Sequence, residues 1–231
     1  MTGARRVCVM TGAGISAESG VPTFRGATGL WRQFRPEDLA TPEAFRRDPK
    51  LVWEWYDWRR GLVRAAQPNA GHVALARFER SRREDFTLVT QNVDGLHERA
   101  GSERLWKLHG DIWSLRCVSC GVESHDERVP LPELPPRCEA CGGLLRPGVV
   151  WFGEPLPAEA RDAAYRAAAA CEVMLVAGTS AQVYPAAALA PRAKRAGARV
   201  IEVNVEETPH SGLADVSLRG AAGTILPQIL L

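Results

Sequence analysis

Four short apolar runs, each ending in a glycine-rich or polar turn, constrain the fold of this chain more than any other feature. They cover residues 6–10, 86–89, 173–177 and 199–203. Continuous apolar runs of this length are typical of strands buried on both faces of a parallel sheet. Helix-like stretches lie between them, over residues 70–83, 157–170 and 185–196. The alternation predicts an α/β fold with a Rossmann-like, doubly wound parallel sheet.

Polar turns follow all four runs and indicate where a ligand would bind. The turns are residues 11–14, 90–92 and 178–180, and Asn204. In a doubly wound sheet, ligands bind beyond the carboxyl ends of the strands. We therefore expect these turns to line one crevice at one edge of the sheet.

Two segments interrupt the alternation and predict a smaller lobe. Residues 30–67 have the pattern of helices separated by prolines, and residues 113–148 carry four cysteines and several prolines. We expect the first segment to be the helical part of the small lobe and the second to be its zinc-ribbon part. The large lobe of this single domain would comprise residues 1–29, 68–112 and 149–231.

The composition is that of an ordinary globular protein and gives no reason to expect nucleic acid or a membrane as a partner. Hydrophobic residues make up 45% and charged residues 24% of the chain, and the net charge is +2. This balance predicts neither nucleic acid nor an anionic membrane as a partner. No apolar run approaches the roughly 18 residues that a membrane-spanning helix needs, and the opening residues lack a signal-peptide pattern. A cytoplasmic protein is expected.

Four of the six cysteines form two C-x-x-C pairs, Cys117 with Cys120 and Cys138 with Cys141. Each pair offers two sulfurs from one turn, and the spacing between the pairs is that of a zinc ribbon. Four thiolates close a tetrahedral site, so the pattern predicts one structural zinc ion that does not activate water. The alternative, two disulfides, is disfavoured in a reducing cytosol. The other two cysteines lie in or beside apolar stretches and are expected to be inert buried thiols.

The loop from Gly12 to Ala17 fits the G-x-G-x-x-G/A fingerprint of dinucleotide sites, directly after a strand. Its glycines let backbone N–H groups approach a pyrophosphate, and the following helix N-terminus favours the negative charge. The acidic residue that usually follows about 20 positions later, at the end of a second strand, is missing. Glu37 and Asp38 lie instead between prolines. The pattern favours a dinucleotide ligand but disfavours an ordinary dehydrogenase.

The loop continues to Arg25 as AESGVPTFR, and this longer string resembles the cofactor-binding signature of the sirtuins, the NAD-dependent protein lysine deacylases. Further strings agree in order: TQNVDGLH at 90–97, LHG at 108–110, the cysteine pairs, GVVWFGE at 148–154, GTS at 178–180 and NVE at 204–206. The resemblance covers nearly the whole chain and implies that residues 1–231 form one sirtuin catalytic domain. Within the family the chain is most similar to the class III desuccinylases and demalonylases of bacteria.

The resemblance implies a reaction that consumes NAD. In the family, the amide oxygen of an acyl-lysine attacks the ribose carbon that bears nicotinamide, and nicotinamide leaves. A histidine then acts as general base on a ribose hydroxyl, and the acyl group ends on ADP-ribose. His109 matches this histidine through its Leu-His-Gly context, although a lone histidine is more often structural. A neutral imidazole suits the role because its pKa lies near the working pH.

The resemblance also implies which residues surround NAD. They are Gly12, Ala13, Gly14, Ser16, Ala17, Glu18, Phe24, Arg25, Trp31, Gln91, Asn92, Asp94, Gly178, Thr179, Ser180, Asn204, Val205, Glu206 and Ala222. Phe24 would shield the reactive ribose, and Arg25 would help to hold the cofactor. The group from Gln91 to Asp94 would face nicotinamide, and the group from Gly178 onward would face adenosine. Two structural alternatives stay open: turn capping by Asn92 and Asp94, and a core position for Phe24.

Acyl-lysine proteins or peptides are the implied substrates, and two segments would bind them. The residues that would pair with the substrate backbone as an added strand are Val150, Trp151, Phe152, Gly153 and Glu154. Tyr56 and Arg59 are spaced i, i+3 on an expected helix, so they share one face.

An arginine fork beside a phenol hydroxyl is a good receptor for a carboxylate. In sirtuins this Tyr-x-x-Arg pair marks the class that removes succinyl, malonyl and glutaryl groups, and Ala17 would leave room for the longer chain. The alternative is that Tyr56 is a core residue and Arg59 a solvated one.

Three other functions compete with acidic deacylation. Two are enzymatic: a plain deacetylase, and a sirtuin-like enzyme that transfers ADP-ribose or hydrolyses NAD. The third is a nucleic-acid binding module, which would need a basic ribbon with aromatic residues. Residues 117–141 instead carry two arginines, five acidic residues and no aromatic one, which argues against that function. The sequence leaves the oligomeric state open, and a monomer is compatible with it.

Overall fold

The computed structural model describes residues 3–25, 29–82 and 85–230. The strands are β1 (Val7–Thr11), β2 (Phe86–Thr90), β3 (Leu105–Lys107), β4 (Gly110–Cys117), β5 (Glu123–His125), β6 (Leu145–Val149), β7 (Val173–Ala177), β8 (Arg199–Asn204) and β9 (Val216–Arg219). The helices are α1 (Gly14–Ala17), η1 (Leu30–Arg32), α2 (Pro36–Leu39), α3 (Pro42–Arg47), α4 (Pro49–Ala65), α5 (Ala70–Arg82), α6 (Leu96–Arg99), α7 (Ala158–Ala170), η3 (Ala186–Ala188), α8 (Leu189–Arg195) and α9 (Ala222–Leu230).

The larger of two sheets has the order β3-β2-β1-β7-β8-β9, and all its neighbouring strands are parallel. The four apolar runs form its four central strands, which confirms the predicted fold class. The edge strands β3 and β9 are only partly buried. They therefore lack the continuous apolar pattern by which the four central strands were predicted.

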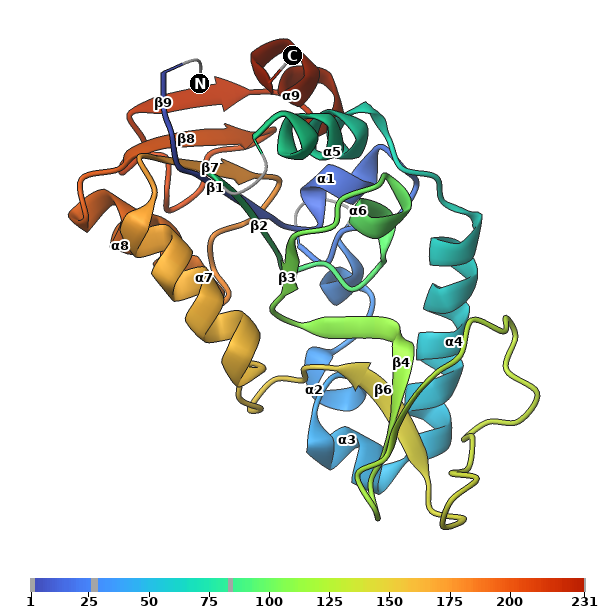
Figure 1. Ribbon diagram of the computed structural model, residues 1–231. Coiled ribbons are helices and arrows are strands. Elements are labelled where there is room, and N and C mark those ends of the chain that lie inside the picture. Colours follow the sequence, from blue (N-terminus) through green and yellow to red (C-terminus); the bar gives the residue numbers. More distant parts are fainter. Residues whose placement is uncertain (1–2, 26–28, 83–84, 231) are drawn as a thin grey trace.

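Alternate residues of the central strands face two different helical layers. Val7 and Val9 pack in a core with α5 and α9, whereas Cys8 and Met10 pack in a core with α7 and α8 (Figure 1). Successive side chains of a strand point to opposite faces of the sheet. Helices on both faces therefore explain why these strands are buried at nearly every position and mostly apolar.

Two of the three predicted helices agree closely with the structure, and the third is interrupted. The helix expected over residues 70–83 is α5, although residue 83 lies outside the described residues. Pro157 is the N-cap of α7. The helix expected over residues 185–196 is split into the 3-10 turn η3 and the α-helix α8. Pro191 lies in the first turn of α8, where its missing N–H removes no helical hydrogen bond.

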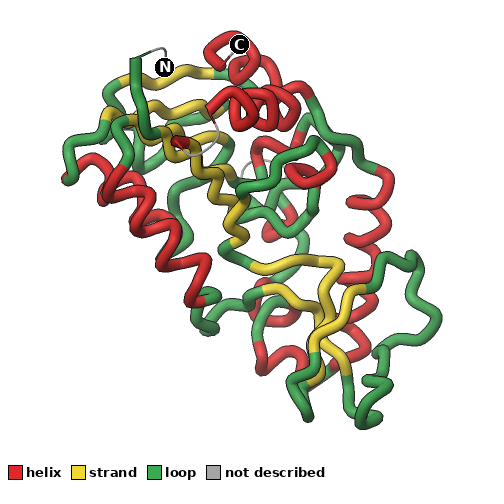
Figure 2. Tube along the Cα trace, viewed as in Figure 1, coloured by secondary structure: helices red, strands yellow, loops and turns green. Residues whose placement is uncertain are grey.

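A second, antiparallel sheet with the order β5-β4-β6 packs with α2, α3 and α4 around a separate core. Figure 2 shows that the chain between β5 and β6 is almost entirely loop. Helix α4 runs beside this sheet (Figure 1). It begins at Pro49 because the Asp48 side chain accepts a hydrogen bond from the N–H of Leu51 at 2.9 Å and thereby caps it.

One face of α4 is anchored to the small sheet. The Trp53 indole donates to the Leu145 carbonyl at 2.7 Å, and the buried Arg60 donates to three carbonyl oxygens, including that of Ile112 at 3.1 Å. These bonds fix the rotation of the helix, so they also decide which way Tyr56 and Arg59 point.

Within the described ranges, no helix combines the length and apolar character needed to cross a bilayer.

Candidate active site and metal centre

The predicted phosphate loop meets the turn after β7 at very short range. The Gly14 N–H donates to the Gly178 carbonyl at 2.7 Å. A Cβ added at Gly12 or Gly14 would lie 2.7 Å from the Gly178–Thr179 turn, which is too close for any side chain. The chain reverses its strand order between β1 and β7, and doubly wound folds bind nucleotides at such a switch point.

A cavity of about 690 Å³ opens beyond these strand ends, a volume within the range of small-molecule sites. The predicted cofactor residues that line it are Gly12, Ala13, Gly14, Ala17, Phe24, Arg25, Trp31, Gln91, Asn92, Gly178, Thr179, Ser180, Asn204, Val205 and Glu206. The predicted substrate residues Tyr56 and Arg59, the segment Val150 to Glu154, and His109 line the same cavity. The fold therefore joins most of the candidate site residues in one place.

Two predicted cofactor residues, Glu18 and Ala222, lie outside this lining. The Glu18 carboxylate accepts a hydrogen bond from the N–H of Gly223 at 2.6 Å. Ala222 is the buried first residue of α9. The two residues meet at the start of α9, where a carboxylate satisfies a free helical N–H.

Ser16 and Asp94 also lie outside the lining, in a buried network beneath the phosphate loop. The Ser16 hydroxyl donates to Asp94 at 2.7 Å, and the Asn92 amide donates to the Gly12 carbonyl at 3.1 Å. Burial raises the pKa of Asp94. Asp94 also accepts from the N–H of Leu96 at 3.0 Å, so the turn-capping alternative holds for this residue. The network fixes the loop from below.

One part of the cavity wall lies outside the predicted site residues. The turn Gln182 to Pro185 lines the cavity, and Tyr184 is 72% exposed there. Its residue types carry no site signature. One signal was available, because this turn follows the Gly178–Ser180 motif and loops at the carboxyl ends of parallel strands line the ligand crevice.

The geometry of His109 defines which ring nitrogen is free. Its Nδ1 lies 3.0 Å from the Gln91 carbonyl oxygen. Because a carbonyl only accepts, Nδ1 carries the hydrogen, and in the neutral ring Nε2 keeps its lone pair. Burial lowers the pKa of His109 below 6.5, although the hydrogen bond to Gln91 raises it. At neutral pH His109 is thus an uncharged ring with one basic nitrogen.

Arg59 projects from α4 into the cavity, and none of the described carboxylates lies within ion-pair distance of it. Its side chain is 5% exposed, and its guanidinium lies 4.3 Å from the Phe24 ring centroid and 5.0 Å from that of Trp55. In the described part of the chain, Arg59 has neither a hydrogen bond nor an ion pair. Burial lowers the pKa of Arg59. The alternative of a solvated arginine is therefore wrong, and the cavity holds a buried cation that is free to bind an anion.

Tyr56 lies on the same face of α4 and is 3% exposed. Burial raises the pKa of Tyr56 to about 12, although the nearby Arg59 lowers it. The phenol is therefore protonated at neutral pH. Tyr56 both packs in the small-sheet core and lines the cavity, so the core alternative describes only part of its environment.

The segment Val150 to Glu154 borders the cavity as a turn rather than an extended strand. The Val150 N–H donates to the His109 carbonyl and the Phe152 N–H to the Ala40 carbonyl, both at 2.9 Å. The N–H groups of Trp151 and Glu154 also donate within the protein. Of these five backbone N–H groups, that of Gly153 donates to no acceptor within the described ranges. In this conformation it is therefore the N–H of the segment that a partner strand could use.

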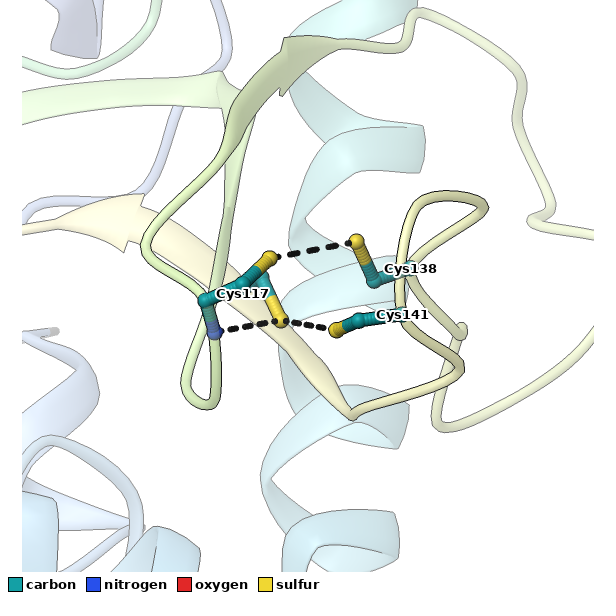
Figure 3. Close-up of side chains that lie close together, drawn as sticks. Cys117, Cys138 and Cys141 are labelled. Atoms are coloured by element: carbon teal, nitrogen blue, oxygen red, sulfur yellow. Dashed lines mark hydrogen bonds between the residues drawn. The ribbon is translucent and has the colours of Figure 1, made fainter.

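The four ribbon cysteines form one cluster. Their sulfur atoms all lie within 4.8 Å of one another, with Cys117 and Cys141 at 3.5 Å and Cys120 and Cys138 at 3.8 Å. Figure 3 shows Cys138 and Cys141 on one loop, facing Cys117 on the other. Four sulfurs at about 2.3 Å from a tetrahedral zinc lie roughly 3.8 Å apart. The cluster fits one structural zinc ion.

Loss of one cysteine should remove the zinc and destabilise the protein. We expect Cys138→Ala to bind no zinc and to unfold at a temperature lower by about 10 °C, because structural zinc supplies folding free energy. Metal content per chain and thermal unfolding measure both effects. The control Cys171→Ala removes a buried thiol outside the cluster and should keep its zinc. One bound zinc per chain in Cys138→Ala would contradict the assignment.

Comparisons with known proteins agree with this architecture. A model of the Sir2 family matches residues 12–185. An NAD-dependent protein deacylase of Aquifex aeolicus is 58% identical over 223 residues, covering 96% of this chain and 93% of the relative.

Two solved structures are also similar. A Sir2 homologue in complex with NAD has a TM-score of 0.92 and 49% identity, covering 99% of this chain and 89% of that chain. Sir2Tm bound to a propionylated peptide has a TM-score of 0.87 and 31% identity, covering 99% and 93%. Because the family model and the relatives match most of its length, this chain belongs to the Sir2 family, the sirtuins that its motifs resemble.

Proposed function

We propose that this protein is an NAD-dependent protein lysine deacylase that prefers acyl groups ending in a carboxylate, such as succinyl, malonyl and glutaryl. Family membership and the deacylase names of the relatives support NAD-dependent deacylation. NAD and an acylated peptide are bound in two similar structures. The acidic preference has one supporting observation, the buried guanidinium of Arg59, which has no hydrogen bond or ion pair among the described residues.

The residues of the cavity fit NAD. The glycines at the switch point leave the backbone open to a pyrophosphate, and the cavity runs from there to His109 and Arg59. NAD supplies the ribose carbon that receives the acyl oxygen, with nicotinamide as leaving group. The residue roles expected from the family motifs, including those of Phe24 and Arg25, are part of this proposal.

His109 is assigned as the general base. Its Nδ1 is engaged by Gln91, so Nε2 is the atom that takes a proton from the ribose hydroxyl. The bond to Gln91 holds the ring in place, and the lowered pKa keeps Nε2 unprotonated before each turnover.

The activity should persist below the pH at which an ordinary histidine is half protonated. Because burial lowers the pKa of His109 from the ordinary value of a histidine, protonation should stop catalysis only at a lower pH than it would for an ordinary histidine. We expect the midpoint of the acidic limb of kcat/KM against pH to lie below the ordinary histidine pKa of about 6.5. A peptide assay from pH 5 to 8 measures the limb. A midpoint above that value would contradict the assigned tautomer and environment.

A panel of acyl-lysine peptides incubated with NAD tests the proposed function. We expect kcat/KM for a succinyl peptide to exceed that for the matching acetyl peptide at least about tenfold, as for a charge-assisted hydrogen bond. Mass spectrometry should detect O-acyl-ADP-ribose, which distinguishes deacylation from ADP-ribosyl transfer and NAD hydrolysis. Equal rates on the two peptides would contradict the acidic preference and would favour a plain deacetylase.

The proposal includes the organisation and location expected from the sequence. Residues 1–29, 68–112 and 149–231 would act as the NAD-binding lobe, and residues 30–67 and 113–148 as the small lobe. A cytoplasmic location suits a ribbon that needs reduced thiols.

A further inference from the structure

The hydroxyl of Tyr56 has a defined orientation in the cavity. It accepts a hydrogen bond from the indole Nε1 of Trp151 at 3.0 Å, across 95 residues of sequence. A phenol has one hydrogen to donate, and no acceptor for it is found among the residues that the structure describes. With its oxygen engaged by the indole, Tyr56 is left to act as a donor toward the cavity.

The Trp151 side chain cannot easily turn away from Tyr56. It is 3% exposed, and its ring lies 3.4 Å from the Arg146 guanidinium and 5.4 Å from the Phe45 ring. Arg146 is buried and forms two hydrogen bonds, at 2.5 and 2.8 Å, with the carboxylate of Glu154. The same carboxylate accepts the N–H of Trp151 at 2.8 Å. The backbone of Trp151 is therefore fixed by Glu154, and its ring is fixed by Arg146 and Phe45.

The indole also keeps Tyr56 and Arg59 apart as two separate donors. Without it, the phenol oxygen could accept an N–H from the guanidinium one helical turn away. That bond would draw the guanidinium away from a ligand and use a donor that the ligand needs. With the indole bound, both donors stay available for one carboxylate.

We propose that Trp151 is a specificity-determining positioning residue, whose indole N–H orients the Tyr56 hydroxyl as a donor for the terminal carboxylate of the acyl group. This inference rests on the proposed acidic deacylase function. It assigns the side chain of Trp151 a role separate from any pairing of its backbone with substrate. The role is one of ground-state recognition, so it concerns KM for acidic substrates more than kcat.

The test measures the ratio of kcat/KM for succinyl and acetyl peptides, so that general damage to the enzyme cancels. We expect Trp151→Phe to lower this ratio about fivefold, the size of one ordinary hydrogen bond, mainly through KM of the succinyl peptide. The matched control is Trp53→Phe, which removes another buried indole bond on α4, to Leu145. It should lower stability without changing the ratio.

A double-mutant cycle separates orientation from packing. In a Tyr56→Phe background there is no hydroxyl to orient, so adding Trp151→Phe should not lower the ratio further. An additional fall in the double variant would show that Trp151 acts only through packing and would overturn the inference.

The two proposals fail in different ways. A parent enzyme without a succinyl preference would contradict the acidic deacylase function itself. A parent enzyme with that preference and a Trp151→Phe variant that keeps it in full would contradict only the role of Trp151.

Discussion

Replacing His109 with alanine is expected to slow deacylation about a thousandfold, the typical contribution of a general base. The reason is geometric, because Nε2 is the free nitrogen of a ring held by Gln91 at 3.0 Å. In the family reaction the base acts after nicotinamide has left. Exchange of labelled nicotinamide into NAD should therefore remain measurable in His109→Ala, while formation of the deacylated peptide is lost. Both are measured with the same acyl peptide.

The matched control for this variant is His125→Ala. His125 is exposed, lies outside the cavity and contacts Glu127, so its loss should leave deacylation unchanged. Turnover of His109→Ala above about a tenth of the parent rate would contradict the assigned role, because a lost general base costs at least a hundredfold. Loss of nicotinamide exchange together with deacylation would instead indicate a damaged NAD site.

Replacing Arg59 with methionine is expected to reverse the order of the two substrates. We expect kcat/KM for the succinyl peptide to fall about a hundredfold, which corresponds to a charge-assisted, two-pronged contact. The acetyl group carries no charge and does not depend on Arg59, so the acetyl peptide should become the better substrate. Steady-state kinetics with both peptides at saturating NAD measure the effect.

Arg59→Met should lower activity on the succinyl peptide, but it should not lower the stability of the fold. Arg59 is buried without an ion pair in the described chain, so methionine removes a desolvation cost and the unfolding temperature should not fall. The neighbouring Arg60→Met is the control, because Arg60 satisfies the carbonyls of Ile112, Asp126 and Arg128 and its loss should lower stability. A succinyl preference that survives in Arg59→Met would contradict the acidic-acyl proposal.

The four apolar runs and the cysteine spacing could be interpreted from sequence because their causes are local. A strand buried on both faces is apolar at most positions, as Val7 to Met10 are. A C-x-x-C turn presents two sulfurs whatever lies around it. The edge strands were not predictable in this way, since partial burial leaves β9 with exposed and polar positions.

Roles that depend on distant contacts could not be derived from any single motif. Glu18 belongs to a cofactor-binding signature, yet its carboxylate accepts from Gly223 at the start of α9, 205 residues away. The hydrogen bonds that Asp94 and Tyr56 form with Ser16 and Trp151 likewise come from other elements.

The sequence by itself determined the family, the parallel sheet, the four-cysteine cluster and the identity of the candidate base. Only the tertiary structure decided that, among the residues it describes, Arg59 is buried without an ion pair, His109 keeps Nε2 free and Tyr56 is left to donate. The physical reason is that a residue type defines which hydrogen bonds and charges a side chain can offer. Whether those are satisfied depends on groups that other parts of the chain bring within about 3 Å of it.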